Sequence, residues 1–223
     1  MEPSSSYLAR LYANRFKPDE RVAKDRLWKV LVEAFLQRRV PPDAVVVDVG
    51  GGYGEFASHV RARRRILVDL NPDAASAAAA GVEVFTADVT QLDRLTELAG
   101  AADVVFMSNL LEHLASPEAV VQTLDGCATL LRPGGTLMII QPNFRYAFAE
   151  YYDFIDHRIP LTDRSVRELV ELAGFRIDEL VPRFLPYSTK GRPSSPALLR
   201  MYLAFPLAWR VFGAQTFVRA TRL

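Results

Sequence analysis

The sequence predicts an α/β fold of the doubly wound kind, a mainly parallel sheet with helices on both faces, in one domain. Short apolar runs alternate with helical stretches between residues 44 and 142, which is the order of a parallel sheet. Each run is apolar on both of its faces, as a sheet covered by helices on both sides requires. A glycine-rich segment at 50–54 follows the first run, where such folds place a ligand-binding turn.

The elements follow in order. Helices are expected first, at 7–16 and 21–39, and the Pro41-Pro42 pair ends the second. At least five parallel strands are expected, at 44–50, 65–70, 82–88, 102–108 and 136–142, with helices at 54–63, 72–81 and 116–131.

Beyond Asn143 the pattern is less regular. Segment 144–162 is rich in aromatic residues without clean periodicity and is a candidate substrate wall. A helix that Thr162 or Asp163 caps and Gly174 ends is expected next. Two closing strands are expected at 175–186 and 214–223, with an apolar, basic stretch between them that is helical at least up to Pro206.

Composition excludes several classes of function. The chain has 9 basic against 5 acidic residues in 1–40, 11 against 21 in 41–180, and 7 against none in 181–223. An acidic middle is a poor surface for phosphates, so no nucleic-acid partner is expected. The single cysteine, Cys127, cannot form an internal disulfide, and the N-terminus lacks the apolar core of a secretory signal. We therefore expect a reducing, cytoplasmic location.

The turn after the first expected strand carries most of the chemical information. It reads Asp48-Val49-Gly50-Gly51-Gly52-Tyr53-Gly54, and its glycines let a ligand approach the backbone at a helix N-terminus. A nicotinamide dinucleotide turn needs a glycine where Glu55 stands, so the dehydrogenase pattern fails. The carboxylate of Asp48 suits a cationic ammonium. The ligand is therefore expected to carry positive charge.

Two further carboxylates end the next expected strands. Asp69 stands where an acid can accept both ribose hydroxyl protons. Asp88, with the backbone amide of Val89, matches the amino group and a ring nitrogen of adenine. Ribose, adenine and an ammonium together describe S-adenosylmethionine. Taken alone, either acid has a plainer reading as the cap of a helix or turn.

With these residues in place, the chain resembles the class I S-adenosylmethionine-dependent methyltransferases, of the bacterial type-11 or type-23 kind. The motifs that carry the resemblance are VVVDVGGGYGEF, ILVDLN, FTADVTQL, DVVFMSNLLEHL and LLRPGGTLMIIQPN, over about residues 40–180. The resemblance implies a seven-stranded sheet with an antiparallel last strand, and S-adenosylhomocysteine as the product. It implies a cofactor site made of Asp48, Gly50, Gly51, Gly52, Gly54, Asp69, Leu70, Asp88, Val89, Ser108, Asn109 and His113.

The resemblance also divides the chain. Residues 1–40 become a helical lid or flank and 41–223 the methyltransferase domain, in which 144–162 and 186–213 are insertions on the acceptor side. Tyr12 and Arg15 resemble lid residues that close over the cofactor, and an exposed helix surface is the plainer reading for both.

The expected enzyme transfers a methyl group to a hydroxyl of a sugar, a lipid-linked saccharide or another small molecule. The protein must align this acceptor and remove its proton. His157 or His113 is the candidate base, with Asp156 close enough in sequence to orient His157, and a histidine that only shapes the cleft is the alternative. No metal is expected, because no cluster of histidine, cysteine and carboxylate appears at ligand spacing.

Two questions stay open in the sequence. Methyl transfer to nitrogen or carbon, and a non-catalytic cofactor-binding partner subunit, are both compatible with it. Segment 196–213 is basic and apolar but shorter than the ~20 residues of a membrane span. It suits an anionic lipid surface at the inner membrane face, a dimer contact, or a cover over the active site. The C-terminal part also resembles bacterial methyltransferases of surface-glycan and lipid-linked saccharide assembly.

Overall fold

The computed structural model describes residues 18–187 and 195–223, which form an α/β fold around one seven-stranded sheet. The strand order is β3-β2-β1-β4-β5-β7-β6. Strands β1 to β5 run parallel, and β7 runs antiparallel to both β5 and β6. The predicted fold class is confirmed, including its antiparallel last strand.

The strands are β1 (Val45–Val49), β2 (Arg64–Asp69), β3 (Val82–Thr86), β4 (Ala102–Ser108), β5 (Leu131–Pro142), β6 (Phe175–Val181) and β7 (Gln215–Arg222). The α-helices are α2 (Pro18–Ala34), α3 (Glu55–His59), α4 (Ala74–Ala77), α5 (Pro117–Leu130), α6 (Phe144–Ala147), α7 (Asp163–Leu172), α8 (Pro196–Ala204) and α9 (Pro206–Phe212). Short 3-10 helices are η1 (Leu36–Arg39), η2 (Val89–Arg94), η3 (Thr96–Leu98), η4 (Leu111–His113) and η5 (Tyr151–Asp153).

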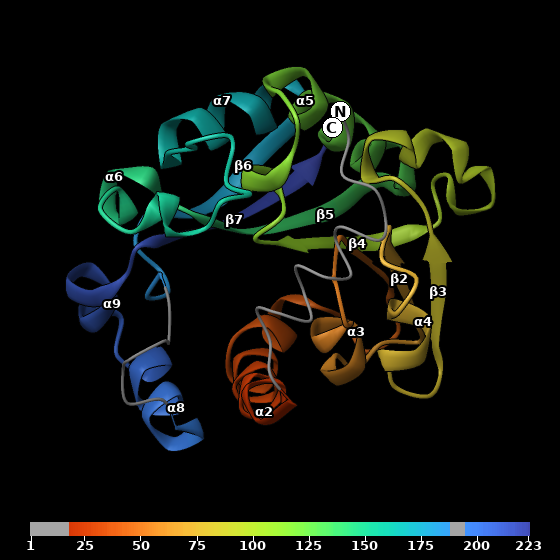
Figure 1. Ribbon diagram of the computed structural model, residues 1–223. Helices are drawn as coiled ribbons and strands as arrows, with labels where there is room; N and C mark the ends of the chain where they lie inside the picture. Colours follow the sequence, from red (N-terminus) through yellow and green to blue (C-terminus); the bar gives the residue numbers. More distant parts are fainter. Residues whose placement is uncertain (1–17, 188–194) are drawn as a thin grey trace.

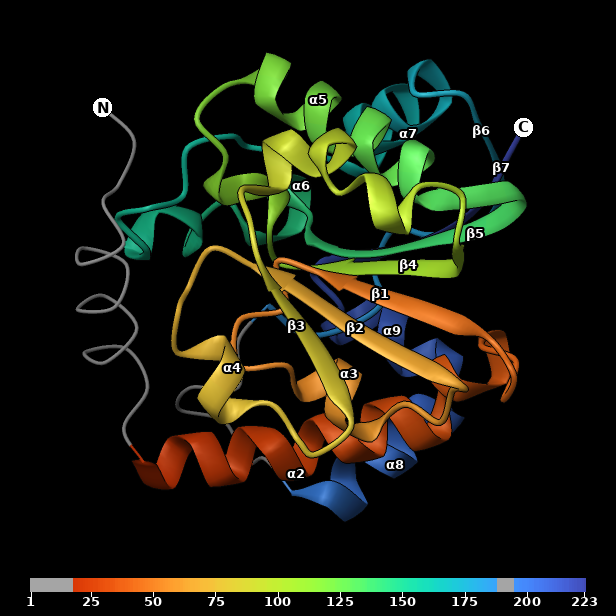
Figure 2. The same ribbon diagram turned by 90° about the vertical axis from the view of Figure 1, so that its right-hand side faces the viewer.

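Helices cover both faces of the sheet. Helices α5 and α7 lie above it and α2, α3 and α8 below it (Figure 1), and the turned view shows the same layers beside β3, β2, β1 and β4 (Figure 2). Adjacent strand residues point to opposite faces. Val47 therefore packs in the core with Leu124 of α5, whereas Val46 packs with Leu31 of α2 and Leu203 of α8.

Some helices are shorter than the sequence predicts. The alanine-rich stretch 72–81 forms only the single turn α4, in which Ala74 alone is buried. Helical propensity without an apolar face to bury does not sustain a helix. The apolar stretch after residue 195 breaks into α8 and α9 at Phe205, because Pro206 has no N–H and restricts the residue before it.

The helix caps are specified locally. Thr162 caps α7 by accepting a hydrogen bond from the Ser165 backbone N–H, and the Ser165 hydroxyl interacts in return with the Thr162 backbone, completing a capping box. Gly174, with φ +82°, follows the end of α7. Both features match the sequence prediction, and they fix where β6 begins.

Candidate functional site

The carboxyl ends of β1 to β4 meet at one edge of the sheet, and β1 lies between β2 and β4 there. This is the point where the strand order reverses, at which doubly wound sheets place their ligands. The sequence-predicted residues 48–54, 69–70, 88–89 and 108–109 all lie at or next to these strand ends.

The turn after β1 requires glycine because φ is positive at Gly50, Gly52 and Gly54 and because Gly51 is crowded. Gly50 has φ +65°, and a Cβ atom there would lie 2.6 Å from Leu110 Cδ1. A Cβ on Gly51 would lie 2.5 Å from Asp48 Oδ2. The turn therefore packs directly on the loop after β4 and on the carboxylate of Asp48 beneath it.

Asp48 is buried below the turn at 1% exposure. Its Oδ2 accepts a hydrogen bond of 3.2 Å from the backbone N–H of Ala57 in α3. Burial raises the pKa of Asp48 to about 8, against a smaller opposite effect of that hydrogen bond. A cation placed beside the turn would favour the charged form of this carboxylate.

Asp69 links the turn to the end of β2. Its Oδ2 accepts from the Gly52 N–H and its Oδ1 from the Asn71 N–H, each at 2.7 Å. Burial raises its pKa, and these two hydrogen bonds act in the opposite direction. The next residue, Leu70, is 39% exposed although it is apolar. The carboxylate of Asp69 is thus followed directly by an exposed apolar side chain, that of Leu70.

Asp88 caps η2, which is the plainer role that the sequence allowed. Its Oδ1 accepts from both the backbone N–H and the hydroxyl of Thr90, each at 2.8 Å. Val89 is the first residue of η2. Its N–H therefore belongs to the donors that a helix start leaves without a partner inside the helix.

The loop after β4 is strained. Asn109 has φ +50°, and among the described residues it is the one non-glycine residue with a positive φ. Its N–H donates to Ile140 O at 2.9 Å, and its side-chain amide reaches the Ser108 hydroxyl at 3.3 Å. This conformation leaves Asn109 exposed at the ligand edge.

A cluster of ionisable side chains follows this loop. His113 Nδ1 lies 3.1 Å from Asp156 Oδ2 and 3.2 Å from the Asp156 backbone oxygen. His113 Nε2 lies 3.8 Å from Oε1 of Glu112, which is 1% exposed. Burial works to lower the pKa of His113, but Glu112 and Asp156 outweigh it, and the pKa is raised. Burial raises the pKa of Glu112.

His157 lies beside this pair, with its ring centroid 4.8 Å from that of His113. Its Nδ1 is 3.4 Å from the Tyr187 hydroxyl, and its ring stacks on Phe154 at 5.1 Å. The sequence predicts that Asp156 orients His157, and in the structure the Asp156 carboxylate contacts His113. The fold brings both candidate bases to one place.

The aromatic segment 144–162 divides between core and surface. Tyr151 is fully buried, and its hydroxyl donates to the Ile159 backbone oxygen. Phe148, Tyr152 and Ile155 are 66%, 59% and 83% exposed. The segment thus places one buried ring, that of Tyr151, 4.7 Å from the ring of His157 and leaves three apolar side chains exposed.

Glu112 is the site residue that the sequence reasoning missed. The signal was an acid between Leu111 and His113 in an otherwise apolar run, which places a carboxylate in the core. The residues that approach it, Asp156 and His157, lie far away in sequence, so spacing could not reveal the cluster. Tyr12 and Arg15 lie outside the described residues.

A family model and curated relatives identify the family of this chain. A family model described as a methyltransferase domain matches residues 20–180. A ubiquinone biosynthesis O-methyltransferase of Xanthomonas axonopodis pv. citri is 33% identical over 117 residues, which cover 49% of this chain and 48% of that protein. The chain thus spans about half the length of the first curated relatives it matches.

Solved structures share the fold. A possible histamine N-methyltransferase from Thermotoga maritima superposes with a TM-score of 0.68 at 16% identity, covering 96% of this chain and 99% of that one. The N-methyltransferase NodS from Bradyrhizobium japonicum, in complex with S-adenosyl-L-homocysteine, gives 0.59 at 15% identity, covering 99% of both.

Proposed function

The chain belongs to the class I S-adenosylmethionine-dependent methyltransferases, and we propose that it transfers the methyl group of S-adenosylmethionine to a hydroxyl oxygen of a small molecule. The observation that carries this proposal is the arrangement of two groups of polar residues on one edge of the sheet. Asp48, Asp69 and Asp88 lie on the β1 to β3 side. The second group, called the Glu112 cluster, lies past β4 and consists of Glu112, His113, Asp156 and His157.

The residues on the β1 to β3 side fit the methyl donor. The glycine turn over Asp48 would take the methionine end, and Ser108 and Asn109 would border the sulfonium. Asp69 would accept from the ribose hydroxyls, because each oxygen has a second lone pair beside its backbone hydrogen bond. Leu70 offers exposed apolar surface for the adenine ring, and Asp88 and the Val89 N–H match its polar edge. When bound, S-adenosylmethionine supplies a methyl carbon activated by its sulfonium.

The cluster past β4 fits the activation of an acceptor oxygen. The Asp156 backbone oxygen can only accept, so His113 Nδ1 carries a proton and Nε2 is the basic atom. A histidine oriented in this way by a carboxylate is the arrangement of a general base. We therefore assign His113 as the residue that takes the hydroxyl proton. His157, packed on Phe154, would shape the acceptor pocket beside it.

The relative from ubiquinone biosynthesis is an O-methyltransferase, which supports oxygen as the acceptor atom. Phe148, Tyr152 and Ile155 are exposed on the segment that also carries His157, and this apolar surface supports an acceptor with a lipid part. A lipid-linked saccharide, which combines hydroxyls with such a part, is our narrower proposal for the acceptor class.

Titration calorimetry with S-adenosylmethionine, and with NADH as the control ligand, tests the donor site before any acceptor is known. We expect micromolar binding of the methyl donor only. Release of S-adenosylhomocysteine is then measured over panels of hydroxyl and amine acceptors, with His113→Gln as the variant. Turnover confined to amines, or unchanged by His113→Gln, would refute the assignment of His113 as the base for oxygen.

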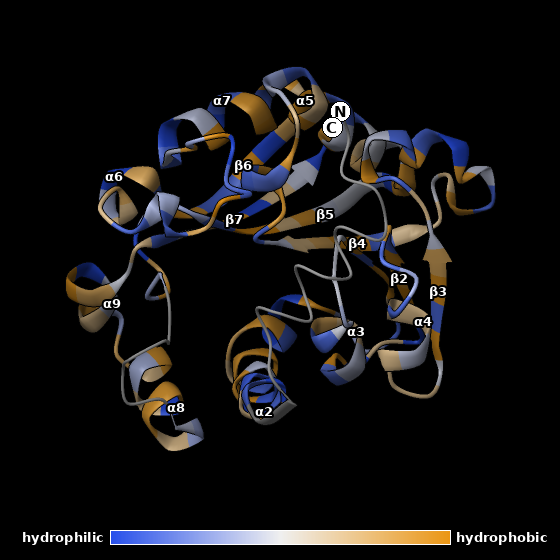
Figure 3. Cartoon of the chain, in the orientation of Figure 1, coloured by the Kyte–Doolittle hydropathy of each residue, from blue (hydrophilic) through white to orange (hydrophobic). Residues whose placement is uncertain are grey.

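We also propose that the outer face of α8 and α9 binds an anionic lipid surface. Six large apolar side chains of this pair are 41% to 65% exposed: Leu198, Met201, Phe205, Leu207, Val211 and Phe212. Arg200 and Arg210 lie among them; Arg200 also pairs with Glu33 of α2 at 3.3 Å, and residues 181–223 contain no acid. Figure 3 shows hydrophobic residues along both helices, at the lower left of the molecule. Apolar side chains mixed with cations suit an anionic bilayer surface.

No helix within residues 18–187 and 195–223 is long and apolar enough to cross a bilayer. Contact through α8 and α9 would therefore be peripheral. Arg183 joins these helices to the acceptor wall, because its guanidinium lies 4.6 Å from the centroid of the Tyr146 ring and donates to Val211 O at 2.7 Å and Gly213 O at 2.8 Å. A lipid-linked acceptor would then reach the cluster from the membrane side.

Sedimentation with phosphatidylglycerol and phosphatidylcholine vesicles tests the lipid contact. We expect binding to the anionic vesicles that weakens in a Met201→Ser, Phe205→Ser double variant. The control is Leu172→Ser, an exposed leucine at the end of α7. Absence of binding to both lipids, together with a dimer that the double variant dissociates, would show that this face is a subunit interface instead.

A further inference from the structure

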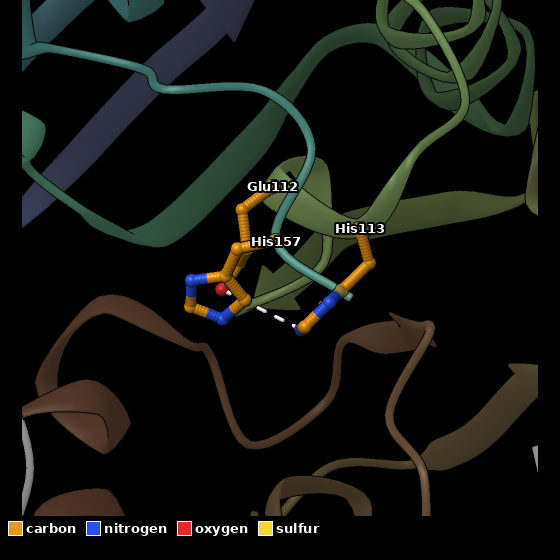
Figure 4. A group of neighbouring side chains, drawn as sticks. All are labelled: Glu112, His113 and His157. Atoms are coloured by element: carbon orange, nitrogen blue, oxygen red, sulfur yellow. Dashed lines mark ion pairs between the residues drawn. The ribbon is translucent and has the colours of Figure 1, made fainter. Parts of the chain in front are cut away.

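We propose that Glu112, His113 and His157 bind one divalent transition-metal ion of the zinc, manganese or iron class. Figure 4 shows the Glu112 carboxylate and the two imidazole rings gathered at one point between η4 and the segment before α7. One ligand atom from each residue lies within 4.8 Å of the other two. Glu112 and His157 are buried and His113 is half-buried, so the point is largely shielded from bulk water.

Hydrogen bonds behind His113 present the correct nitrogen. Nδ1 is 3.2 Å from the Asp156 backbone oxygen and 3.1 Å from its carboxylate, so Nδ1 carries the hydrogen. The lone pair of Nε2 then lies 3.8 Å from Glu112 Oε1. Two electron-rich atoms repel each other unless a metal cation or a proton lies between them, and a metal ion is the cation that could bind His157 as well. A carboxylate behind a histidine is also the usual support of a metal ligand.

The other two ligands are supported in the same way. The Tyr187 hydroxyl donates to Tyr151 O at 3.3 Å, so its oxygen accepts from His157 Nδ1 at 3.4 Å, and the lone pair of His157 is on Nε2. Gln141 Nε2 donates to Glu112 Oε2 at 3.0 Å and fixes that carboxylate. Each ligand is thus oriented by a second residue.

The donor set determines the class of ion. Two imidazoles and one carboxylate suit zinc, manganese or iron, whereas magnesium and calcium prefer oxygen ligands throughout. Bonds of about 2.1 Å place tetrahedral ligand atoms about 3.4 Å apart, so a bound ion would draw atoms now within 4.8 Å of one another together by up to about 1.4 Å. Three protein ligands leave one coordination position open.

A hydroxyl bound at the open position would lose its proton to water more easily, because the ion stabilises the negative oxygen that remains. His113 would then act as a ligand instead of as the base. This last step rests on the proposed function, whereas metal binding itself does not.

Metal binding is tested on protein stripped with a chelator and dialysed. Cobalt(II) is the probe, because its visible absorption reports the ligand geometry, and zinc titration by calorimetry gives the affinity. We expect one ion per chain, loss of binding in Glu112→Gln and His157→Gln, and binding about 10- to 100-fold weaker in Asp156→Asn. The matched control is His59→Gln, a histidine that pairs with Asp25 on α2 instead. Melting curves confirm that each variant is folded.

The outcomes separate this inference from the proposed function. Metal binding that depends on the three ligands, without methyl transfer to any acceptor, would support the metal site and refute the proposed function. Methyl transfer that survives chelation in protein free of metal would overturn the role of the ion in activating the acceptor and support His113 as the base. Zinc affinity equal in His157→Gln and in the wild-type protein would overturn the metal site itself.

Discussion

Replacing Asp69 by asparagine tests whether one carboxylate both holds the glycine turn and takes the ribose. Its two oxygens accept the Gly52 and Asn71 N–H groups at 2.7 Å each, and the residue is 8% exposed. Asparagine keeps the shape but has one acceptor oxygen. One of the two backbone N–H groups would therefore face an amide N–H₂ in a buried position.

The magnitude follows from that lost bond. A hydrogen bond to a charged group contributes about 1.5 to 3 kcal/mol. A chain of this size loses about 2 to 4 °C of melting temperature per kcal/mol, so we expect Asp69→Asn to melt roughly 3 to 12 °C lower. Loss of a charged acceptor for the ribose hydroxyls should weaken S-adenosylmethionine binding by roughly 10- to 150-fold, since 1.4 kcal/mol corresponds to a factor of ten.

Scanning fluorimetry measures the melting temperature and calorimetry the affinity. The control is Asp73→Asn, an exposed acid of the same loop whose side chain makes no capping hydrogen bond. A variant that melts lower but binds S-adenosylmethionine as the wild type does would refute the ribose role. A variant unchanged in both would refute the whole account of Asp69.

Three further predictions concern stability and binding. Burial raises the pKa of Asp48 to about 8, so the folded state holds this proton more tightly than the unfolded state. The free energy of unfolding of the ligand-free protein, measured in urea, should therefore fall by about 2 to 3 kcal/mol between pH 6 and pH 9. In Asp48→Asn this fall should vanish, and an unchanged dependence on pH would contradict the assignment. Thr162→Ala removes the capping box of α7 and should lower the free energy of unfolding by about 1 kcal/mol, whereas the control Thr162→Ser keeps the cap. Equal melting temperatures of the wild type and both variants would show that the cap contributes nothing to stability. Gly50→Ala adds a Cβ at φ +65° and 2.6 Å from Leu110. It should lower the free energy of unfolding by about 1 to 2 kcal/mol and weaken binding of the methyl donor. Stability and affinity equal to those of the wild type would mean that the turn can move to accept the added methyl group.

The sheet could be predicted from the sequence because its strands carry the signal locally. The runs at 45–49, 66–68 and 102–108 are short, mostly apolar and separated by helical stretches. The acids and glycines that follow these strands were predictable for the same reason, since parallel strands bring their carboxyl ends to one edge. Local caps such as Thr162 belong to this class too.

The Glu112 cluster could not be predicted as a cluster, because it depends on tertiary contacts between segments far apart in the sequence. Backbone N–H groups of Arg158 and Ile159 donate to Glu112 O at 2.7 Å and 3.2 Å, and this pairing fixes the segment that carries Asp156 and His157. No periodicity encodes such a contact. The sequence likewise could not predict which side of α8 packs on α2. In the structure Leu203 is buried in the core cluster that includes α2, whereas Met201 is exposed.

The contact between Gly50 and Leu110 has a consequence for engineering this protein. A turn proposed to serve the methyl donor packs directly on the loop that leads to Glu112, so donor affinity and acceptor choice cannot be tuned independently through that loop. Libraries that aim at new acceptors should keep Leu110 constant. They should vary 148–155 instead, a segment whose packing partners include Ala214 and Tyr187.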